Sequence, residues 1–254
     1  MVMEANLEPP FIRVSDLRVM YDGTTILENV NFEVGRGEIL FIIGGSGCGK
    51  STLLKSMVGL VEPDPGSVVF GDRDLVGATG DDRSAILRRF GVMYQGGALL
   101  GSLTLLENVR LPLEEYSGLP EEAQDLLALM KLKLVGLEGY DHHFPSRISG
   151  GMLKRASIAR AMALDPEILF LDEPSAGLDP VTSFELDRLI YFLSRNLGIT
   201  FVIISHELSS IQKIADRVIM LDKSARGIIA VGKPGDLAAS TVPRVKQFFS
   251  RGEA

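Results

Sequence analysis

The sequence predicts an α/β fold built on a mainly parallel sheet, with an antiparallel β region at the N-terminus and a helical insertion in the middle of the chain. Three observations predict it. Short, almost uniformly apolar runs alternate with helical patterns, the first 34 residues alternate apolar and polar side chains, and the middle of the chain is helical in pattern. Uniformly apolar runs are typical of strands covered on both faces, as in parallel sheets.

The strands can be placed in order along the chain. Residues 11–19 and 24–34 alternate around Tyr21-Asp22-Gly23, which predicts an antiparallel hairpin. The buried-strand patterns lie at residues 39–43, 168–171, 199–204 and 218–221. The second of these runs ends at Asp172 and the third at Ser205-His206. Because open α/β sheets bind ligands at the carboxyl ends of their strands, we expect a site there.

Two helices are predicted in the middle of the chain. The first opens at Pro120-Glu121-Glu122 and closes at Gly136, and an apolar residue recurs every fourth position at Leu126, Met130 and Leu134. The second begins at Ser149 and carries Met152, Ala156, Ala159 and Ala163 on one face. We therefore expect a single domain over residues 1–254, with a core at 1–95 and 165–254, a helical subdomain at 96–164 and a C-terminal tail at 241–254.

Composition and charge exclude several classes of protein. The 254 residues are 46% apolar and 23% charged, as in a soluble globular protein of one or two domains. The net charge of −7 disfavours wrapping of a nucleic-acid backbone. One cysteine forms no internal disulfide, which favours a reducing compartment. Residues 1–10 do not resemble a signal peptide, and no apolar run is long enough to span a bilayer.

A glycine-rich segment after the strand pattern at 39–43 fits the phosphate-loop pattern G-x-x-x-x-G-K-[ST] and precedes a helix pattern at 53–60. Its nucleotide-binding residues are Gly44, Gly45, Ser46, Gly47, Cys48, Gly49, Lys50, Ser51 and Thr52. Backbone N–H groups of such a loop surround phosphate oxygens at a helix N-terminus. Lys50 is expected to reach the β- and γ-phosphates, and the Ser51 hydroxyl to ligate Mg²⁺. The core is therefore expected to be that of a P-loop NTPase, with Cys48 chemically passive.

Two carboxylates end the strand pattern at 168–171. Asp172 is placed to hold Mg²⁺, and Glu173 points differently and is a candidate base for the attacking water. Asp-Glu-Pro is also good turn chemistry, and the phosphate loop earlier in the chain is what favours the functional interpretation.

At Ile148-Ser149-Gly150-Gly151-Met152 the sequence resembles the signature segment of ABC transporter ATPases, and the resemblance runs almost from end to end. Ser149 is a good helix N-cap, and the two glycines leave N–H groups open at a helix N-terminus, which makes a second anion site. The resemblance implies the ABC ATPase fold, ATP and Mg²⁺ as cofactors, and ATP hydrolysis. It also implies that Ser149, Gly150, Gly151 and Met152 bind the γ-phosphate held by a second copy of the chain.

Further positions match the family individually. Gln95 resembles the glutamine that senses Mg²⁺ and water and couples the core to the helical insertion. His206 resembles the histidine that contacts the γ-phosphate, and Tyr21 the aromatic residue that stacks on adenine. The segment Ser175, Ala176, Gly177, Leu178 and Asp179 resembles the D-loop, which crosses the dimer interface.

A narrower resemblance points to the Mla-type phospholipid-transport ATPases that work with MCE-domain proteins. Met152 stands where the usual signature has glutamine, which removes one polar side chain and leaves both glycine backbones. Further matches are the segments 96–100, 107–109, 111–113 and 243–249. In the last segment Val245, Phe248 and Phe249 have helical spacing, and they either cap the chain's own core or dock a partner or second copy.

The resemblance implies a subunit at the cytoplasmic face of the bacterial inner membrane, beneath a permease, with an MCE-domain protein and a small regulatory subunit as further partners. The main alternative is an importer or exporter ATPase for another substrate, such as an amino acid or a peptide. A chromosome-maintenance ATPase would need long heptad arms, and the insertion at 96–164 is too short and lacks heptads. A GTPase would need an Asn-Lys-x-Asp motif, which the sequence does not contain. A nonhydrolytic module would leave Glu173 and His206 idle. The coupling surface is expected near residues 95–109, where most of the leucines are core and one or two face the permease.

Overall fold

Two β-sheets organise the chain in the computed structural model, which describes residues 10–63 and 67–250. The first sheet is antiparallel and has the strand order β2-β1-β4-β5. Its strands are β1 (Ile12–Tyr21), β2 (Thr24–Val34), β4 (Val68–Phe70) and β5 (Arg73–Asp74). In the hairpin Ile12 pairs with Val34 and Tyr21 with Thr24. The N-terminal hairpin predicted from alternation is confirmed.

The second sheet has six strands in the order β10-β9-β3-β8-β7-β6, and all neighbours are parallel except β10 against β9. Its strands are β3 (Ile39–Gly44), β6 (Phe90–Met93), β7 (Ile168–Asp172), β8 (Thr200–Ile204), β9 (Arg217–Asp222) and β10 (Gly227–Gly232). All four strands predicted from apolar runs are present in it. The mainly parallel sheet of the predicted α/β fold is therefore confirmed.

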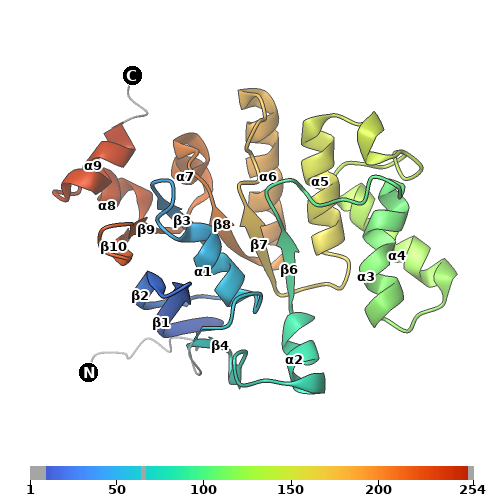
Figure 1. Cartoon of the computed structure of the whole chain (residues 1–254). Coiled ribbons are helices and arrows are strands. Elements are labelled where there is room, and N and C mark those ends of the chain that lie inside the picture. Colours follow the sequence, from blue (N-terminus) through green and yellow to red (C-terminus); the bar gives the residue numbers. More distant parts are fainter. Residues whose placement is uncertain (1–9, 64–66, 251–254) are drawn as a thin grey trace, which may run out of the picture.

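Both faces of the six-stranded sheet are buried, which explains the uniformly apolar runs. On one face Leu40 and Ile42 join a core with the antiparallel sheet and with helices α1 (Lys50–Met57) and α2 (Gly80–Leu87). On the opposite face Phe41 joins a second core. In Figure 1 the antiparallel sheet lies at the lower left and the helices within residues 105–161 lie at the right. The helices that contribute to the second core include α6 (Pro180–Leu197), α7 (Leu208–Ile214), α8 (Pro234–Ala238) and α9 (Pro243–Ser250).

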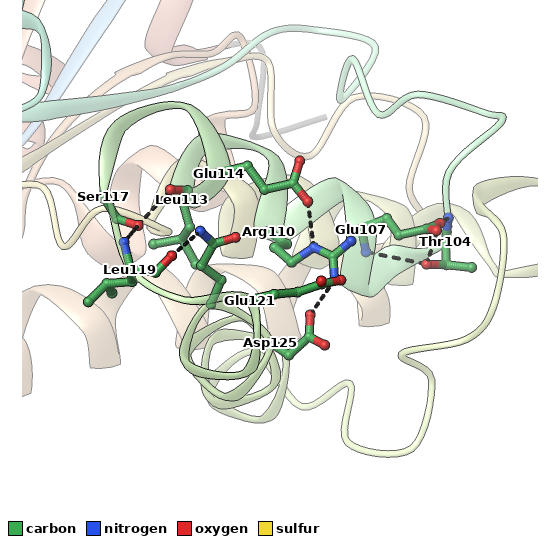
Figure 2. A network of polar contacts seen from close by, with 10 residues as sticks. Thr104, Glu107, Arg110, Leu113, Glu114, Ser117, Leu119, Glu121 and Asp125 are labelled. Carbon is green, nitrogen blue, oxygen red and sulfur yellow. Dashed lines mark hydrogen bonds and ion pairs between the residues drawn. The ribbon is translucent and has the colours of Figure 1, made fainter.

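Helices occupy the chain between β6 and β7, as the sequence predicts. They are α3 (Leu105–Tyr116), α4 (Glu121–Leu134), the 3₁₀ turn η1 (Pro145–Arg147) and α5 (Gly150–Ala161). Figure 2 shows the polar contacts that join α3 to α4, in which Arg110 donates to Glu114 on its own helix and to Glu121 and Asp125 on α4. Thr104 caps α3 in a reciprocal pair with Glu107, which fixes where the helix begins.

The predicted helix α4 is present, but of the stripe that indicated it only Leu134 packs against the core, unlike Leu126 and Met130. Both side chains are exposed. The buried residues of α4 are Gln124, Ala128, Lys131 and Leu132. Gln124 donates to the Leu119 carbonyl at 2.7 Å, and the Lys131 ammonium pairs with Asp165, so polar groups with partners turn inward. Apolar spacing therefore predicted the helix correctly without predicting its orientation.

The C-terminal helix α9 packs on the chain's own core. Val245 and Phe249 are buried together with Leu237 of α8, and Arg244 pairs with Asp222 at the end of β9. Of the two interpretations of the apolar tail, the structure supports the one in which it caps the core. The last part of the predicted tail, residues 251–254, lies outside the described residues. In the described part of the chain no helix combines the length and the apolar character needed to cross a membrane.

Candidate nucleotide site

The phosphate loop joins the end of β3 to the start of α1, at the centre of the sheet. Gly44 has φ +147°, and a Cβ there would lie 2.4 Å from the Leu221 carbonyl oxygen. Gly49 has φ +101°, and its Cβ would lie 2.7 Å from Leu27 Cδ2 on the hairpin. Both positions therefore require glycine, because the backbone is left-handed and the space is filled. This close approach brings the N-terminal hairpin against the loop.

Lys50, the first residue of α1, folds its side chain over the loop. Its ammonium donates to the carbonyl oxygens of Gly44 at 2.8 Å and Gly45 at 3.1 Å. The cation and the open N–H groups of the helix N-terminus therefore face the same small region, which suits an anionic ligand. Cys48 is buried in this loop, and burial raises the pKa of its thiol although Lys50 opposes the shift. A protonated, buried thiol is a poor nucleophile, so the loop uses the backbone of Cys48.

Asp172 ends β7 beside the start of α1. Burial and the neighbouring Glu173 raise the pKa of the Asp172 carboxyl, whereas the Ser51 hydroxyl that donates to it and the nearby Lys50 lower it. Ser51 and Asp172 thus place a hydroxyl and a carboxylate together, the oxygen ligands that Mg²⁺ prefers. Within residues 10–63 and 67–250 no group of three or more His, Cys, Asp or Glu side chains could hold a metal by itself. A Mg²⁺ ion here would also need oxygens of the nucleotide, as is usual for this ion.

Glu173 follows Asp172 in a left-handed conformation, with φ +50°. Its N–H donates to the Ile204 carbonyl at the end of β8, at 2.9 Å. That contact turns the side chain toward His206, whose Nδ1 lies 2.8 Å from Glu173 Oε2. Oε2 is buried and has no well-aligned hydrogen-bond donor in the described part of the chain. A buried carboxylate oxygen without an aligned donor, next to an exposed imidazole, is suited to accept a proton from a water molecule.

The signature segment occupies a separate place in the fold. Ser149 caps α5 by accepting from the Met152 N–H at 3.3 Å. A Cβ on Gly151 would lie 2.3 Å from Thr182 Cγ2, so a side chain there would displace Thr182 at the start of α6. Ser149, Gly151 and Met152 line a cavity of about 270 Å³. It shares no lining residue with the cavity of about 310 Å³ that Gly45, Ser46 and Cys48 border. Within one chain the signature segment and the phosphate loop therefore border different cavities.

The predicted D-loop connects Glu173 to helix α6. Gly177, at φ +79°, lies exposed in it, and Ser175 is buried. Asp179 caps α6 by accepting from the N–H groups of Val181 at 3.0 Å and Thr182 at 3.1 Å. These bonds and the Thr182 hydroxyl lower the pKa of Asp179. Asp179 therefore has a structural task within its own chain.

Gln95 and Tyr21 lie at the margin of the site. Gln95 is exposed and follows β6, whose Met93 pairs with Leu171 of β7, so it lies one strand over from Asp172. Tyr21 ends β1 and is 43% exposed, which makes it available for stacking.

Sequence reasoning gave no role to two basic residues of α5, although Lys154 follows the signature segment as in the family. Lys154 donates to the carbonyl oxygens of Gln95 and Glu173. Arg160 donates to those of Ala98 at 2.7 Å and Gly97 at 3.3 Å. The sequence shows a lysine in the first two turns after the signature segment, but only the structure shows which backbone it reaches.

A phosphate loop at a helix N-terminus, with two carboxylates and a histidine at the ends of neighbouring parallel strands, defines a P-loop ATP-binding protein. The family model described as ABC transporter matches residues 27–176, more than half of the chain. The chain therefore belongs to the ABC transporter family and is an ATP-binding ABC ATPase cassette.

Relatives and solved structures agree with this assignment. The chain is 38% identical over 225 residues to the intermembrane phospholipid transport system ATP-binding protein MlaF of Escherichia coli (strain K12), covering 88% of this chain and 82% of MlaF. It is 36% identical over 239 residues to the probable ribonucleotide transport ATP-binding protein mkl of Mycobacterium leprae, covering 94% of this chain and 68% of mkl. The chain thus spans about two thirds of the length of mkl. It superposes on the dimeric ATP-binding cassette MJ0796, bound to ADP and Pi, with a TM-score of 0.78, 31% identity and coverage of 88% and 98%.

Proposed function

We propose that this chain hydrolyses ATP as the motor subunit of a lipid transporter, with two copies enclosing two ATP–Mg²⁺. The observation that carries the catalytic part is the pair of Glu173 and His206 beside the phosphate loop. His206 Nδ1 lies 2.8 Å from Glu173 Oε2, at the ends of β7 and β8. The geometry of this contact is not that of a hydrogen bond, so the buried oxygen has no aligned donor among the described residues. A water molecule that donates to this oxygen would complete the arrangement.

Each residue then has a separate task. Lys50 and the loop N–H groups bind the β- and γ-phosphates, and Tyr21 stacks on the base. Ser51, Asp172 and Gln95 supply the oxygen ligands for Mg²⁺, which neutralises charge on the transferred phosphoryl group when it is bound. Glu173 accepts the proton of the attacking water, and His206 orients that water and the γ-phosphate.

The separation of the two anion sites supports a dimer. Because the signature cavity and the phosphate loop do not meet within one chain, the N-terminus of α5 is free to bind the γ-phosphate held by a second copy. The solved cassette MJ0796, with a TM-score of 0.78, is described as dimeric. ATP binding would close such a dimer, and hydrolysis with phosphate release would reopen it.

A permease, an MCE-domain protein and a small regulatory subunit are the proposed partners, at the cytoplasmic face of the inner membrane. The name of MlaF, a phospholipid transport ATP-binding protein, supports phospholipid as the substrate. The coupling surface that we propose lies between Gln95 and α3. Of the leucines there, Leu105 is buried and Leu100 is exposed, so Leu100 is the side chain most available to a permease helix.

A second substrate class is favoured by one specific observation. The mkl relative, 36% identical over 94% of this chain, is described as a probable ribonucleotide transport protein. A ribonucleotide transporter would keep every ATPase residue and change the permease and its partners.

Purification of the tagged chain from its native membranes in mild detergent tests the partner assignment, with mass spectrometry of the proteins and lipids that accompany it. The proposal predicts a permease, an MCE-domain protein and bound phospholipid. A permease with a solute-binding protein and no MCE-domain protein would keep the ATPase assignment and contradict the lipid substrate.

A further inference from the structure

Lys154 lies on the second turn of α5 and is buried between the ends of two strands. Its ammonium donates to the Gln95 carbonyl at 3.3 Å and to the Glu173 carbonyl at 3.4 Å. Gln95 follows β6 and Glu173 follows β7, so one side chain joins three segments: the signature helix, the segment after β6 and the proposed catalytic base.

A lysine is a costly residue for this place unless its charge is used. Burial lowers the pKa of Lys154, and the carboxylates of Glu173 and Asp172 oppose that shift. Within the described residues Lys154 has no ion-pair partner at 4 Å or closer, and its ammonium donates to backbone carbonyl oxygens. An apolar side chain of the same length would fill the space without desolvating a cation. We therefore attribute the lysine at this position to the carbonyl groups that its ammonium binds, and not to packing.

Lys154 donates to the backbone of Glu173, and the conformation of that backbone sets the direction of the Glu173 side chain. Glu173 has φ +50°, a conformation that L-residues seldom adopt and that the surroundings must enforce. Its N–H is fixed by the Ile204 carbonyl, and its carbonyl accepts from the Ala176 N–H at 3.2 Å and from Lys154. A shift of that carbonyl rotates the peptide and moves the carboxylate that lies beside His206.

Arg160 lies further along α5 and also contacts the segment that follows β6. It donates to Gly97 and Ala98 in the segment that follows Gln95. Two cationic side chains of α5 therefore donate to the segment after β6. Of these two, Lys154 also donates to Glu173. These contacts connect α5, whose N-terminus carries the signature segment, to the segments that follow β6 and β7.

We propose that Lys154 is a positioning residue that couples the signature helix to the carboxylate of Glu173. This inference rests on the proposed function, because it assumes that Glu173 is the base. It assigns Lys154 no contact with ATP, so removing its ammonium should impair turnover and spare nucleotide affinity.

The test compares Lys154→Met, which removes the ammonium, with Lys154→Arg, which keeps a cation. Lys131→Met is the matched control, since Lys131 is also a buried lysine of the helical segment but pairs with Asp165 away from the site. ATP affinity is measured by calorimetry, and turnover is measured on the full chain with its permease. We expect kcat of Lys154→Met to fall about tenfold to a hundredfold, as misplacement of a catalytic group does. We expect its ATP affinity to stay within about twofold, Lys154→Arg to recover most of the rate, and Lys131→Met to match the wild type.

Several results would overturn the inference. Unchanged kcat in Lys154→Met, an equal loss in Lys131→Met, or a loss confined to ATP affinity would each contradict a positioning role. If Lys154→Met does not fold, as judged by thermal unfolding, Lys154→Gln takes its place, and a full rate in that variant contradicts the inference equally. A wild-type chain that binds its permease and hydrolyses no ATP would instead contradict the proposed function.

Discussion

Backbone conformation places the polar residues of the nucleotide site, and the sequence revealed this at some residues only. The glycines at 44 and 49 follow from the phosphate-loop pattern, and the structure shows why no other residue fits there. The left-handed backbone of Glu173 could not be predicted, because an Asp-Glu-Pro sequence does not indicate a positive φ at the glutamate. The reach of Lys154 to two carbonyls was equally invisible, since a lysine's spacing does not say where its side chain ends.

Lys50→Ala tests the phosphate contact at this scale. The ammonium lies over the Gly44 and Gly45 carbonyls, and a hydrogen bond to a charged group contributes about 1.5–3 kcal/mol. Affinity for ATP should therefore fall about tenfold to a hundredfold, measured by calorimetry with the folded chain. Lys55→Ala on the same helix is the control, because Lys55 is exposed and outside the loop. Equal ATP affinities for Lys50→Ala and the wild type would rule out the assigned role.

Individual elements follow from their sequence patterns more closely than their orientations do. The apolar runs predict β3, β7, β8 and β9 because strands buried on both faces carry no polar positions. The helix α4 was predicted by the same kind of spacing, yet Gln124 and Lys131 face inward because each finds a polar partner. The spacing of apolar residues predicts a helix, but it does not predict which polar residues will find hydrogen-bond or ion-pair partners in the interior.

Asn108 of α3 offers a test at the scale of an element. Its buried amide accepts from the Leu100 N–H at 2.7 Å and donates to the carbonyls of Leu100, Leu103 and Thr104. Asn108→Ala leaves the Leu100 N–H and the Leu103 carbonyl without their bonds to this side chain, whereas the carbonyls of Leu100 and Thr104 keep backbone donors. An unpaired polar group costs about 1–3 kcal/mol, so we expect the free energy of unfolding in urea to fall by about 3 kcal/mol.

The control is Asn196→Ala. Asn196 is exposed on α6 and makes one bond, to the Phe192 carbonyl. Its variant should remain within about 0.5 kcal/mol of the wild type. A difference of less than about 0.5 kcal/mol between the wild type and Asn108→Ala would show that Asn108 does not hold this segment.

Asp187 of α6 gives a pH-dependent prediction. It is buried and accepts from the Ser210 hydroxyl of α7 at 2.9 Å. Burial raises its pKa; the Ser210 bond and Lys213 lower it, and Glu207 raises it further. The stability linked to a raised carboxyl pKa is present below the unfolded pKa, about 3.9, and is lost as the pH rises through the folded pKa.

Asp187→Asn removes that titration while keeping an oxygen for Ser210. Its free energy of unfolding relative to the wild type should therefore increase as the pH rises from about 4, and the two proteins should differ least at acid pH. Urea unfolding at several pH values measures this. A difference that is the same at every pH would show that Asp187 titrates normally.

The arrangement of the whole molecule separates what a single chain can do from what needs a second copy. The sequence identified the phosphate loop and the signature segment, and strand order then accounts for the convergence of Lys50, Asp172, Glu173 and His206 at one sheet edge. The distance between that edge and the signature cavity depends on how the helical segment between β6 and β7 packs. Packing of that kind is set by many weak contacts, so no motif could have predicted it.

The oligomeric state of Glu173→Gln with ATP tests the central claim most directly. Replacement of the base should slow hydrolysis about 10²–10⁴-fold while ATP still binds. Sedimentation should then show a dimer with ATP and a monomer with ADP. Adding Ser149→Asp, which keeps an N-cap on α5 but repels phosphate, should abolish the dimer and leave ATP affinity unchanged. A Glu173→Gln chain that binds ATP and stays monomeric at every concentration, or hydrolyses it at the wild-type rate, would contradict the account.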